Sequence, residues 1–271
     1  MSGTWPASLL LVGCGNMGGA MLEGWLAGGI EPARLSVLDP ALDAAPAGVT
    51  LLREAPATPA EAVLLGFKPH MLGRIAPGLG SAIDGNTVVL SVLAGVELAV
   101  LQARFPQARG VVRVMPNLAA ALGKSPIALA QAGLDDPACA DVFALLQPLG
   151  TPEWIEDEQF DLVTALAGSG PAFVYRFIDA LAAGAQELGL DAAQAERLAI
   201  AMTEGAASLA SASEHGPGEL ADRVASPGGV TREGMNVLDA EDALARLVHA
   251  TLAAARDRSA AMAREAKAAR D

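Results

Sequence analysis

Glycines with the spacing of a nucleotide-binding turn lie near the start of the chain. The stretch "SLLLVGCGNMGGAML" places Gly13, Gly15 and Gly18 in a G-x-G-x-x-G pattern, after an apolar run and before a helical pattern. In such a setting the first glycine permits a tight turn, the second lets the backbone approach a pyrophosphate, and the third lets the helix pack on the strand. The pattern predicts a dinucleotide site, with Asn16 and Met17 facing the phosphates or the nicotinamide half.

A second position that bears on the cofactor follows the next apolar run, "LSVLDPA". Asp39 lies 26 residues after Gly13, where an acidic residue can accept hydrogen bonds from a ribose 2′-hydroxyl and so favour NAD(H). An aspartate before Pro40 also fits an ordinary turn. Arg53, after the third apolar run, could instead accommodate the 2′-phosphate of NADP(H). The sequence therefore leaves NAD(H) and NADP(H) both open.

Two further apolar runs end in polar residues, in "GFKPH" and "VRVMPN". Ligands of open parallel sheets bind at the carboxyl ends of the strands, so these residues are expected near the glycine turn. Lys68, followed by Pro69, could reach a cofactor ribose or phosphate, although a strand-end lysine is often simply solvated. Asn117 could offer its amide to the nicotinamide or substrate, or could belong to an ordinary turn.

Two later stretches break helical patterns with small residues. "ASPGGVTREG", residues 225–234, has Arg232 and Glu233 as its only ionisable side chains and precedes a helical pattern. The amino terminus of a helix offers free N–H groups and a favourable dipole to an anion. "AGSGPA", residues 167–172, puts two glycines and a proline inside a helical pattern, at roughly 1 kcal/mol per glycine and 3 for proline. Such a break often marks a site.

The elements that carry these residues follow from hydrophobic periodicity. Short apolar runs alternate with amphipathic stretches in the first half, as in a parallel sheet with helices on both faces. From about residue 157 long Ala-rich helical patterns replace them. The predicted fold is α/β, with a Rossmann-type doubly wound sheet domain over 1–156 and an all-α dimerisation domain over 157–271. Strands are expected at 8–12, 35–38, 49–52, 62–67, 87–92, 111–115 and 127–130, and the main helices at 17–27, 70–79, 97–104, 137–146, 161–188, 191–212 and 241–266.

Composition narrows the class of partner. The 271 residues carry a net charge of −13, which argues against nucleic acid and anionic membrane surfaces. Cys14, Cys139 and three scattered histidines give no disulfide framework and no metal site. No lysine or arginine precedes the apolar run at 9–12, and no segment has the roughly 20 apolar residues of a membrane span. We therefore expect a cytoplasmic protein without metal.

Five motifs together resemble one family. "GCGNMG", "KP" at 68–69, "RVMPN" at 113–117, "LAGSGPAF" at 166–173 and "SPGGVT" at 226–231 have the order and spacing of the pyrroline-5-carboxylate reductases. The resemblance extends over residues 8–260. Departures are Leu118-Ala119, where the family usually has Thr-Pro, and Val230, where it usually has threonine. The ending Asp39-Pro40 also differs from the sequences that often accompany NADP preference.

The resemblance implies a hydride transfer from NAD(P)H to the C=N bond of 1-pyrroline-5-carboxylate, giving proline. It implies that backbone amides in "SPGGVT" hold the substrate carboxylate and that the Thr231 hydroxyl, the catalytic group, bonds the ring nitrogen. It also implies an interlocked homodimer with a site shared between subunits, and in some members a ring of dimers. The residues assigned to substrate are Ser169, Gly170, Gly228, Gly229, Val230 and Thr231.

Other functions remain open at this stage. A β-hydroxyacid dehydrogenase-like enzyme would place a catalytic lysine in the first long helix of the second domain, but no lysine lies between Lys124 and Lys267. A reductase of a related cyclic imine carboxylate would need the same anion-binding terminus. A non-catalytic dinucleotide-binding protein could keep the fold without turnover.

Overall fold

The computed structural model describes residues 5–268 and divides into two compact units. The first comprises Met1–Ser169 with Ala255–Asp271, and the second comprises Gly170–Ala254. The sequence-based division at 156/157 differs from these units. Residues 157–169 and the end of the last helix pack with the sheet, and Ser259 Oγ donates a hydrogen bond to Asp161 Oδ1 at 2.7 Å.

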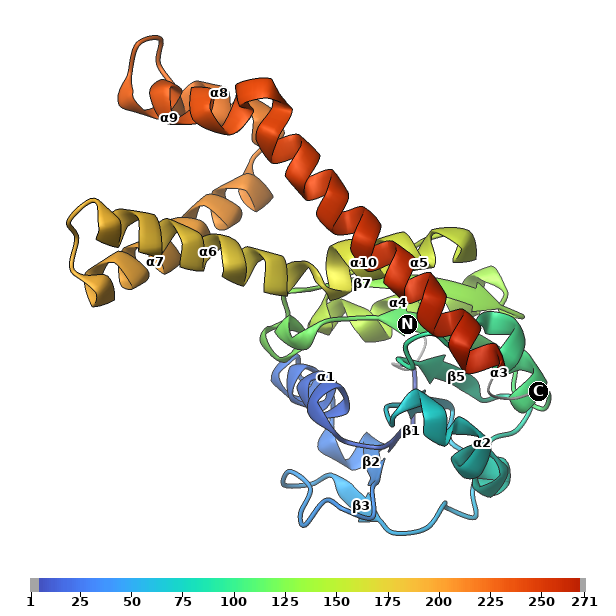
Figure 1. Ribbon diagram of the computed structural model, residues 1–271. Helices are drawn as coiled ribbons and strands as arrows, with labels where there is room; N and C mark the ends of the chain where they lie inside the picture. Colours follow the sequence, from blue (N-terminus) through green and yellow to red (C-terminus); the bar gives the residue numbers. More distant parts are fainter. Residues whose placement is uncertain (1–4, 269–271) are drawn as a thin grey trace. The chain divides into compact units, whose positions relative to one another are not determined.

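The described part of the first unit contains an eight-stranded sheet in the order β3-β2-β1-β4-β5-β6-β7-β8 (Figure 1). Every neighbouring pair is parallel except β6 and β7. The seven predicted strands are confirmed, and an eighth lies at the predicted domain boundary, on the sheet edge, where its proline is tolerated. The strands are β1 Leu9–Val12, β2 Leu35–Leu38, β3 Thr50–Leu52, β4 Ala62–Leu65, β5 Val88–Ser91, β6 Gly110–Met115, β7 Ser125–Ala132 and β8 Gly150–Trp154.

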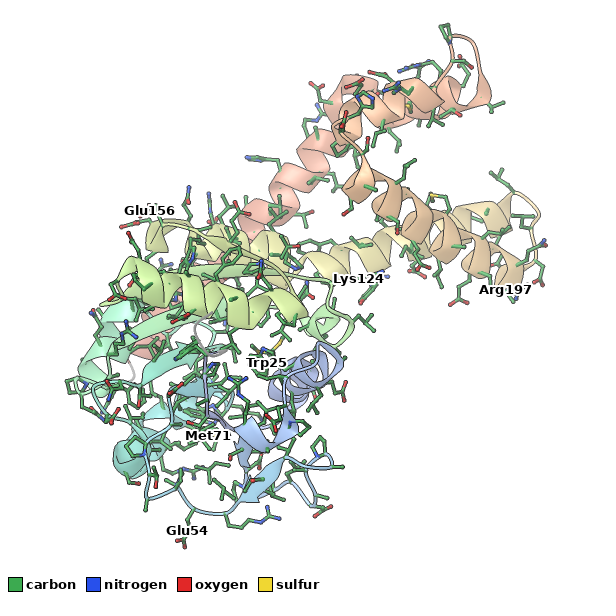
Figure 2. All side chains as sticks on the ribbon, turned by 180° about the vertical axis from the view of Figure 1, so that it is seen from behind. Trp25, Glu54, Met71, Lys124, Glu156 and Arg197 are labelled. Atoms are coloured by element: carbon green, nitrogen blue, oxygen red, sulfur yellow. The ribbon has the colours of Figure 1, made fainter. Side chains whose placement is uncertain are left out.

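Helices cover both faces of this sheet, which confirms the doubly wound arrangement. On one face α1 (Asn16–Ala27) and α4 (Asp136–Leu146) pack on the apolar strands, and Trp25 Nε1 donates to Leu145 O at 2.7 Å. Figure 2 shows Trp25 inside the sheet domain. The other face is covered by α2 (Leu72–Ile75) and α3 (Leu98–Arg104). The central strands are continuous apolar runs because both of their faces are buried.

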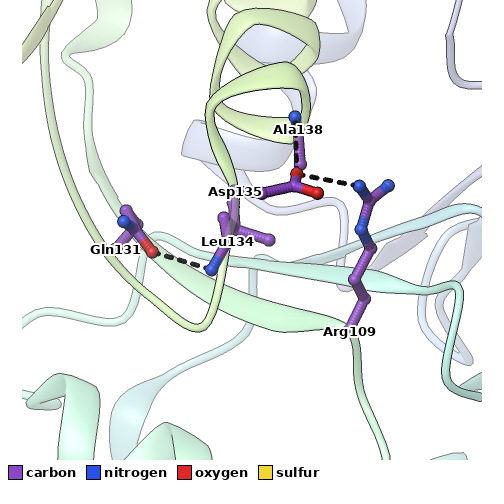
Figure 3. A network of polar contacts seen from close by, with 5 residues as sticks. All are labelled: Arg109, Gln131, Leu134, Asp135 and Ala138. Atoms are coloured by element: carbon purple, nitrogen blue, oxygen red, sulfur yellow. Dashed lines mark hydrogen bonds and ion pairs between the residues drawn. The ribbon is translucent and has the colours of Figure 1, made fainter.

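A polar network fixes the turn from β7 into α4 (Figure 3). Asp135 caps this helix, because its Oδ1 accepts a hydrogen bond from Ala138 N at 3.0 Å. The same oxygen accepts from Arg109 Nη2 at 2.9 Å. Gln131 Oε1 accepts from Leu134 N at 3.0 Å. These hydrogen bonds fix the position at which α4 begins after the antiparallel strand β7.

The helix predicted over 161–188 is interrupted. A short helix, α5 (Phe160–Val163), leads into a π-helical turn, Thr164–Gly168, before α6 begins at Gly170. The break coincides with the glycine and proline residues of "AGSGPA", which weaken a regular helix. The helices from this point are α6 Gly170–Glu187, α7 Ala192–Ala212, α8 Pro217–Val224, α9 Val230–Asp239 and α10 Ala243–Ala268.

The second unit has little core of its own. Helices α6 and α7 pack against each other, yet Ala195, Ala199 and Ala225 are the only buried residues of this unit among the described residues. Many large apolar side chains are exposed here, which is the pattern of a surface that another chain covers. Among the described residues, no helix has the length and apolarity that a bilayer crossing requires. The most exposed large apolar side chains include Tyr175, Leu188, Val224, Val230, Val237 and Leu247.

Candidate dinucleotide and substrate sites

The glycine turn has the geometry that its spacing predicts. Gly13 has a φ of 87°, and a Cβ there would lie 2.9 Å from the backbone nitrogen of Phe67. A Cβ on Gly18 would lie 2.6 Å from Gly13 O, so this glycine lets α1 approach the turn closely. A Cβ on Gly15 would meet no heavy atom within 4 Å. The first and third glycines serve the fold, whereas the second borders open space.

Helix α1 presents an uncapped amino terminus to that space. Gly15 is its N-cap without a side-chain hydrogen bond, and no acidic residue lies in the first turn. Gly19 N donates to Gly15 O at 2.7 Å and closes the first helical turn. The N–H groups of Asn16, Met17 and Gly18 therefore have no intrahelical acceptor and suit an anion. The Met17 side chain is partly buried against the core on the α1 face of the sheet, so its assignment to the cofactor, through its backbone N–H, stays a prediction.

A cavity of about 1060 Å³ opens at the carboxyl ends of the first strands of the sheet. Its basic side chains are Arg53, Lys68 and Arg74, and its acidic side chains are Asp39 and Glu54. Basic groups therefore outnumber acidic ones here although the chain has a net charge of −13, which favours an anionic ligand. The cavity has the place and the donor chemistry for a dinucleotide. Of the predicted cofactor residues, it is lined by Gly13, Gly15, Asn16, Asp39, Lys68 and Pro69.

Asp39 uses its carboxylate to hold the turn. Its Oδ2 accepts a hydrogen bond from Cys14 N at 2.8 Å, and its Oδ1 accepts from Ala41 N at 2.8 Å. The pKa of the Cys14 thiol is raised, mainly by burial and to a smaller extent by the nearby carboxylates of Asp39 and Glu23. Arg53 Nη1 donates to the backbone oxygen of Asp39 at 2.6 Å. The aspartate thus joins the end of β2 to the glycine turn.

Asn117 lies outside the cavity lining and is committed to internal bonds. The residue is 6% exposed, and its backbone nitrogen donates to Ser125 Oγ at 2.8 Å. Its Oδ1 accepts from Ala119 N at 2.9 Å, and its Nδ2 donates to Ala167 O at 3.0 Å. The side chain caps the turn after β6 and ties that turn to the π-helical segment. The predicted contact with nicotinamide or substrate gains no support from this geometry.

Arg113 is a positioning residue that motif reasoning missed. It is 7% exposed on β6, and its Nη1 lies 2.6 Å from Asp157 Oδ1. Its guanidinium carbon lies 3.7 Å from the ring centroid of Phe160. These contacts fasten the segment before the π-helical turn to the sheet. A charged residue inside the apolar strand "GVVRVM" was the available signal.

Ser169 and Gly170 fall at the junction of the two units. Ser169 ends the π-helical turn, and its backbone nitrogen donates to Thr164 O at 3.0 Å. Gly170 is the first residue of α6 and has open space beside its Cα. Each belongs to a different compact unit. Their assignment to a substrate pocket stays a prediction.

The stretch "SPGGVT" forms the predicted helix start. Gly228 has a φ of 69°, and Gly229 is the N-cap of α9 without a side-chain hydrogen bond. Gly229 N donates to Ser226 O at 3.0 Å, so this N–H, one of the "SPGGVT" amides expected to hold the carboxylate, is already used. Glu233 N donates to Gly229 O at 3.2 Å. The free donors are the N–H groups of the next three residues, 230–232.

Side chains around this terminus leave it open. The Val230 side chain is 91% exposed, so this position offers the terminus only its backbone N–H. Thr231 is exposed, and its hydroxyl has no hydrogen-bond partner within residues 5–268. Arg232 Nη2 donates to Asp222 Oδ1 at 2.8 Å and thereby holds the first turn of α9 to α8. Within the described residues, no group of three His, Cys, Asp or Glu side chains is placed to hold a metal ion.

The comparisons with known proteins cover both units. A family described as "Pyrroline-5-carboxylate reductase dimerisation" matches residues 157–262. The pyrroline-5-carboxylate reductase of Pseudomonas aeruginosa is 34% identical over 95% of this chain and 97% of that protein. The chain belongs to the pyrroline-5-carboxylate reductase family. The enzyme of that name from Escherichia coli is 31% identical over 88% of this chain and 92% of its own length.

Solved pyrroline-5-carboxylate reductase structures share the fold. The Coxiella burnetii protein superimposes with a TM-score of 0.85 at 27% identity, covering 93% of this chain and 97% of that one. The Plasmodium falciparum protein, solved with NADP bound, superimposes with a TM-score of 0.83 at 22% identity, covering 96% of this chain and 100% of that one. The family resemblance drawn from the five motifs is confirmed. A β-hydroxyacid dehydrogenase-like assignment is therefore not retained.

Proposed function

We propose that this protein is a pyrroline-5-carboxylate reductase, which transfers a hydride from NAD(P)H to the C=N bond of 1-pyrroline-5-carboxylate and so makes L-proline, the last step of proline biosynthesis. The observation that carries the proposal is the 34% identity with the Pseudomonas aeruginosa reductase over 95% of this chain. At that coverage the likeness spans most of both compact units. Local fold alone would not assign a reaction.

The cofactor end of the proposal rests on the cavity of the first unit. The reduced nicotinamide supplies the hydride when it is bound. The uncapped amides of α1 suit the pyrophosphate, and Gly15 leaves room for its approach. Lys68 and Pro69 line the same cavity and would contact the cofactor. The chain's task toward the dinucleotide is to hold and orient it.

The substrate end of the proposal rests on the start of α9. The N–H groups of Val230, Thr231 and Arg232 would hold the substrate carboxylate, aided by the helix dipole. An added Cβ on Gly228 would meet no heavy atom within 4 Å, so this glycine leaves space for the anion to approach, whereas a Cβ on Gly229 would lie 2.6 Å from Ser226 Oγ. The Thr231 hydroxyl would bond the ring nitrogen and help orient the imine for hydride transfer. Ser169 and Gly170 would line the pocket beside it.

Self-association completes the proposal. The matched family region is described as a dimerisation region, and the helical unit exposes large apolar side chains. We place the working enzyme as a homodimer whose site combines the cavity of one subunit with the α9 terminus of its partner, and a ring of dimers as the larger form. We further propose that the enzyme acts in the cytoplasm and has neither a nucleic acid nor a membrane as a partner.

Purified protein given 1-pyrroline-5-carboxylate should oxidise NADPH or NADH, measured as loss of the absorbance of the reduced nicotinamide. A six-membered cyclic imine carboxylate offered in parallel tests the related-imine reading, and we expect slower turnover with it. Faster turnover of the larger ring would move the assignment to that substrate. Cofactor binding without turnover of either imine would favour a non-catalytic dinucleotide-binding protein.

A further inference from the structure

Three alternate residues of one extended segment contact the π-helical turn and the residues that lead into it. Arg113 and Met115 lie on β6, and Asn117 follows with φ −130° and ψ 178°, so the chain stays extended and the three side chains share one face. The Arg113 guanidinium binds Asp157, ahead of the turn. A Cβ added to Gly168 would lie 3.4 Å from Met115 Sδ, so this methionine packs closely against the end of the turn.

The third contact, from Asn117, supplies a donor that the helix itself lacks. In a regular α-helix the carbonyl oxygen of Ala167 would accept a hydrogen bond from the N–H of residue 171. That residue is Pro171, which has no N–H and whose ring clashes with the carbonyl four residues earlier. Asn117 Nδ2 donates to Ala167 O at 3.0 Å instead. The amide therefore holds the carbonyl that the proline displaces from a regular helix.

Asn117 is itself fixed on the side of the sheet. It is 6% exposed, and its backbone nitrogen donates to Ser125 Oγ, on β7, at 2.8 Å. Its Oδ1 accepts from Ala119 N at 2.9 Å. Because the oxygen of the amide faces a donor, its nitrogen is the atom that faces Ala167 O. The position of that carbonyl therefore follows from the position of the sheet.

Ser169 directly follows the turn. Its backbone nitrogen donates to Thr164 O at 3.0 Å, with the five-residue spacing of a π-helical turn. Closing the turn to the four-residue spacing of an α-helix would shift the next residue by one position, about 100° around the helix axis. Ser169 is half-buried, and its hydroxyl has no hydrogen-bond partner within residues 5–268. The turn thus decides where this side chain lies.

We propose that Asn117 is a positioning residue for substrate binding, which holds the π-helical turn so that the Ser169 hydroxyl meets the substrate. The asparagine, the turn and the serine belong to the same compact unit. The inference rests on the proposed reductase function, in which Ser169 lines the substrate pocket. It gives the motif "RVMPN" a role in imine binding that acts through the turn.

Asn117→Asp tests the amide, because it keeps the acceptor for Ala119 N and removes the donor to Ala167 O. At saturating NADPH the KM for 1-pyrroline-5-carboxylate should rise about tenfold, with kcat and the calorimetric Kd for NADP⁺ within about twofold of wild type. Gln131→Glu is the matched control. It makes the same amide-to-carboxylate change at another turn of the sheet domain, where Oε1 accepts from Leu134 N, and should have wild-type kinetics.

Pro171→Ala loosens the turn by an independent route. The alanine N–H gives the Ala167 carbonyl a donor within the helix, so the turn relaxes toward a regular α-helix. The KM for the imine should rise as in Asn117→Asp, whereas Tm should not fall, because alanine is the better helix former. This variant decides the question if Asn117→Asp does not fold.

A double-mutant cycle with Ser169→Ala shows whether the asparagine acts through the serine. The double variant Asn117→Asp/Ser169→Ala should have the KM of Ser169→Ala alone, within about twofold, because both changes remove the same contact with substrate. Additive losses would overturn the inference, as would a wild-type KM in any of the three single variants or a Kd for NADP⁺ raised in Asn117→Asp. Wild-type protein that binds NADP⁺ without reducing the imine would instead contradict the reductase proposal.

Discussion

Replacing Gly15 by alanine separates the role of the glycine turn in cofactor binding from its role in folding. Gly15 has φ −72° and ψ −161°, which alanine adopts without strain, and the added Cβ meets no heavy atom within 4 Å. Alanine is a poorer N-cap than glycine, by up to about 1 kcal/mol. For a chain of this size that lowers Tm by about 2–4 °C at most. The fold should therefore survive.

The effect on binding should be far larger. The new methyl group enters the cavity at the point where the α1 amides face the ligand, so it prevents the close approach of a pyrophosphate. Loss of two amide hydrogen bonds to a charged phosphate, each worth about 1.5 kcal/mol or more, amounts to about 3 kcal/mol. The Kd for NADP⁺ should rise about 100-fold, and the Kd for NAD⁺ by a similar factor.

Gly19→Ala provides the matched control for Gly15→Ala. Gly19 lies inside α1, does not line the cavity, and has Cys14 O as the nearest atom to an added Cβ, at 4.0 Å. Alanine in a helix interior should add about 1 kcal/mol of stability and leave binding unchanged. Calorimetry and thermal melting of both variants give the comparison. Wild-type affinity in Gly15→Ala, or an equal loss in Gly19→Ala, would refute the placement of the pyrophosphate.

Three further predictions concern the rest of the chain. Thr231→Val should lower kcat by about tenfold or more, and it should leave Tm unchanged because the hydroxyl is exposed and makes no internal hydrogen bond. The control variant Val230→Ala should have wild-type kinetics. Equal kinetics in the two variants would remove the threonine hydroxyl from the mechanism. Arg113→Ala should lower the free energy of unfolding by about 2 kcal/mol in chemical denaturation, because it removes a buried guanidinium that bonds Asp157, whose side chain is 35% exposed, and stacks on Phe160; a loss below about 0.5 kcal/mol would contradict that role. Val237→Asp should weaken self-association, measured by analytical ultracentrifugation, because it puts a charge on an apolar surface whose Val237 side chain is 73% exposed in the single chain. Unchanged association would place the subunit contact elsewhere.

The sheet domain was predictable because its signals are local. Continuous apolar runs such as "LLLV" and "AVLL" identify strands buried on both faces, and the alternating helical stretches require a parallel, doubly wound sheet. The turn at Gly13 followed from glycine spacing alone. β8 was missed because "GTPEW" is short, carries a proline and lies on the sheet edge, where the burial pattern is weak.

The site residues were harder to predict, because a side chain's partners depend on distant parts of the chain. Asn117 has a residue type and place that suit a ligand group, yet its Nδ2 donates to Ala167 O, fifty residues further along, and a contact with a ligand stays a prediction. Met17 stands at a variable position of the glycine motif, and only the packing of α1 on the sheet shows that its side chain turns to the core. The Gly229 N–H is used in a turn that the sequence does not reveal.

The most direct test of the central claim is the identity and amount of the product. The protein, incubated with 1-pyrroline-5-carboxylate and NADPH, should form L-proline in equal amount to the NADPH oxidised, with both quantities followed by mass spectrometry and absorbance. Oxidation of NADPH without proline, or no oxidation by protein that binds NADP⁺, would contradict the assignment as a pyrroline-5-carboxylate reductase.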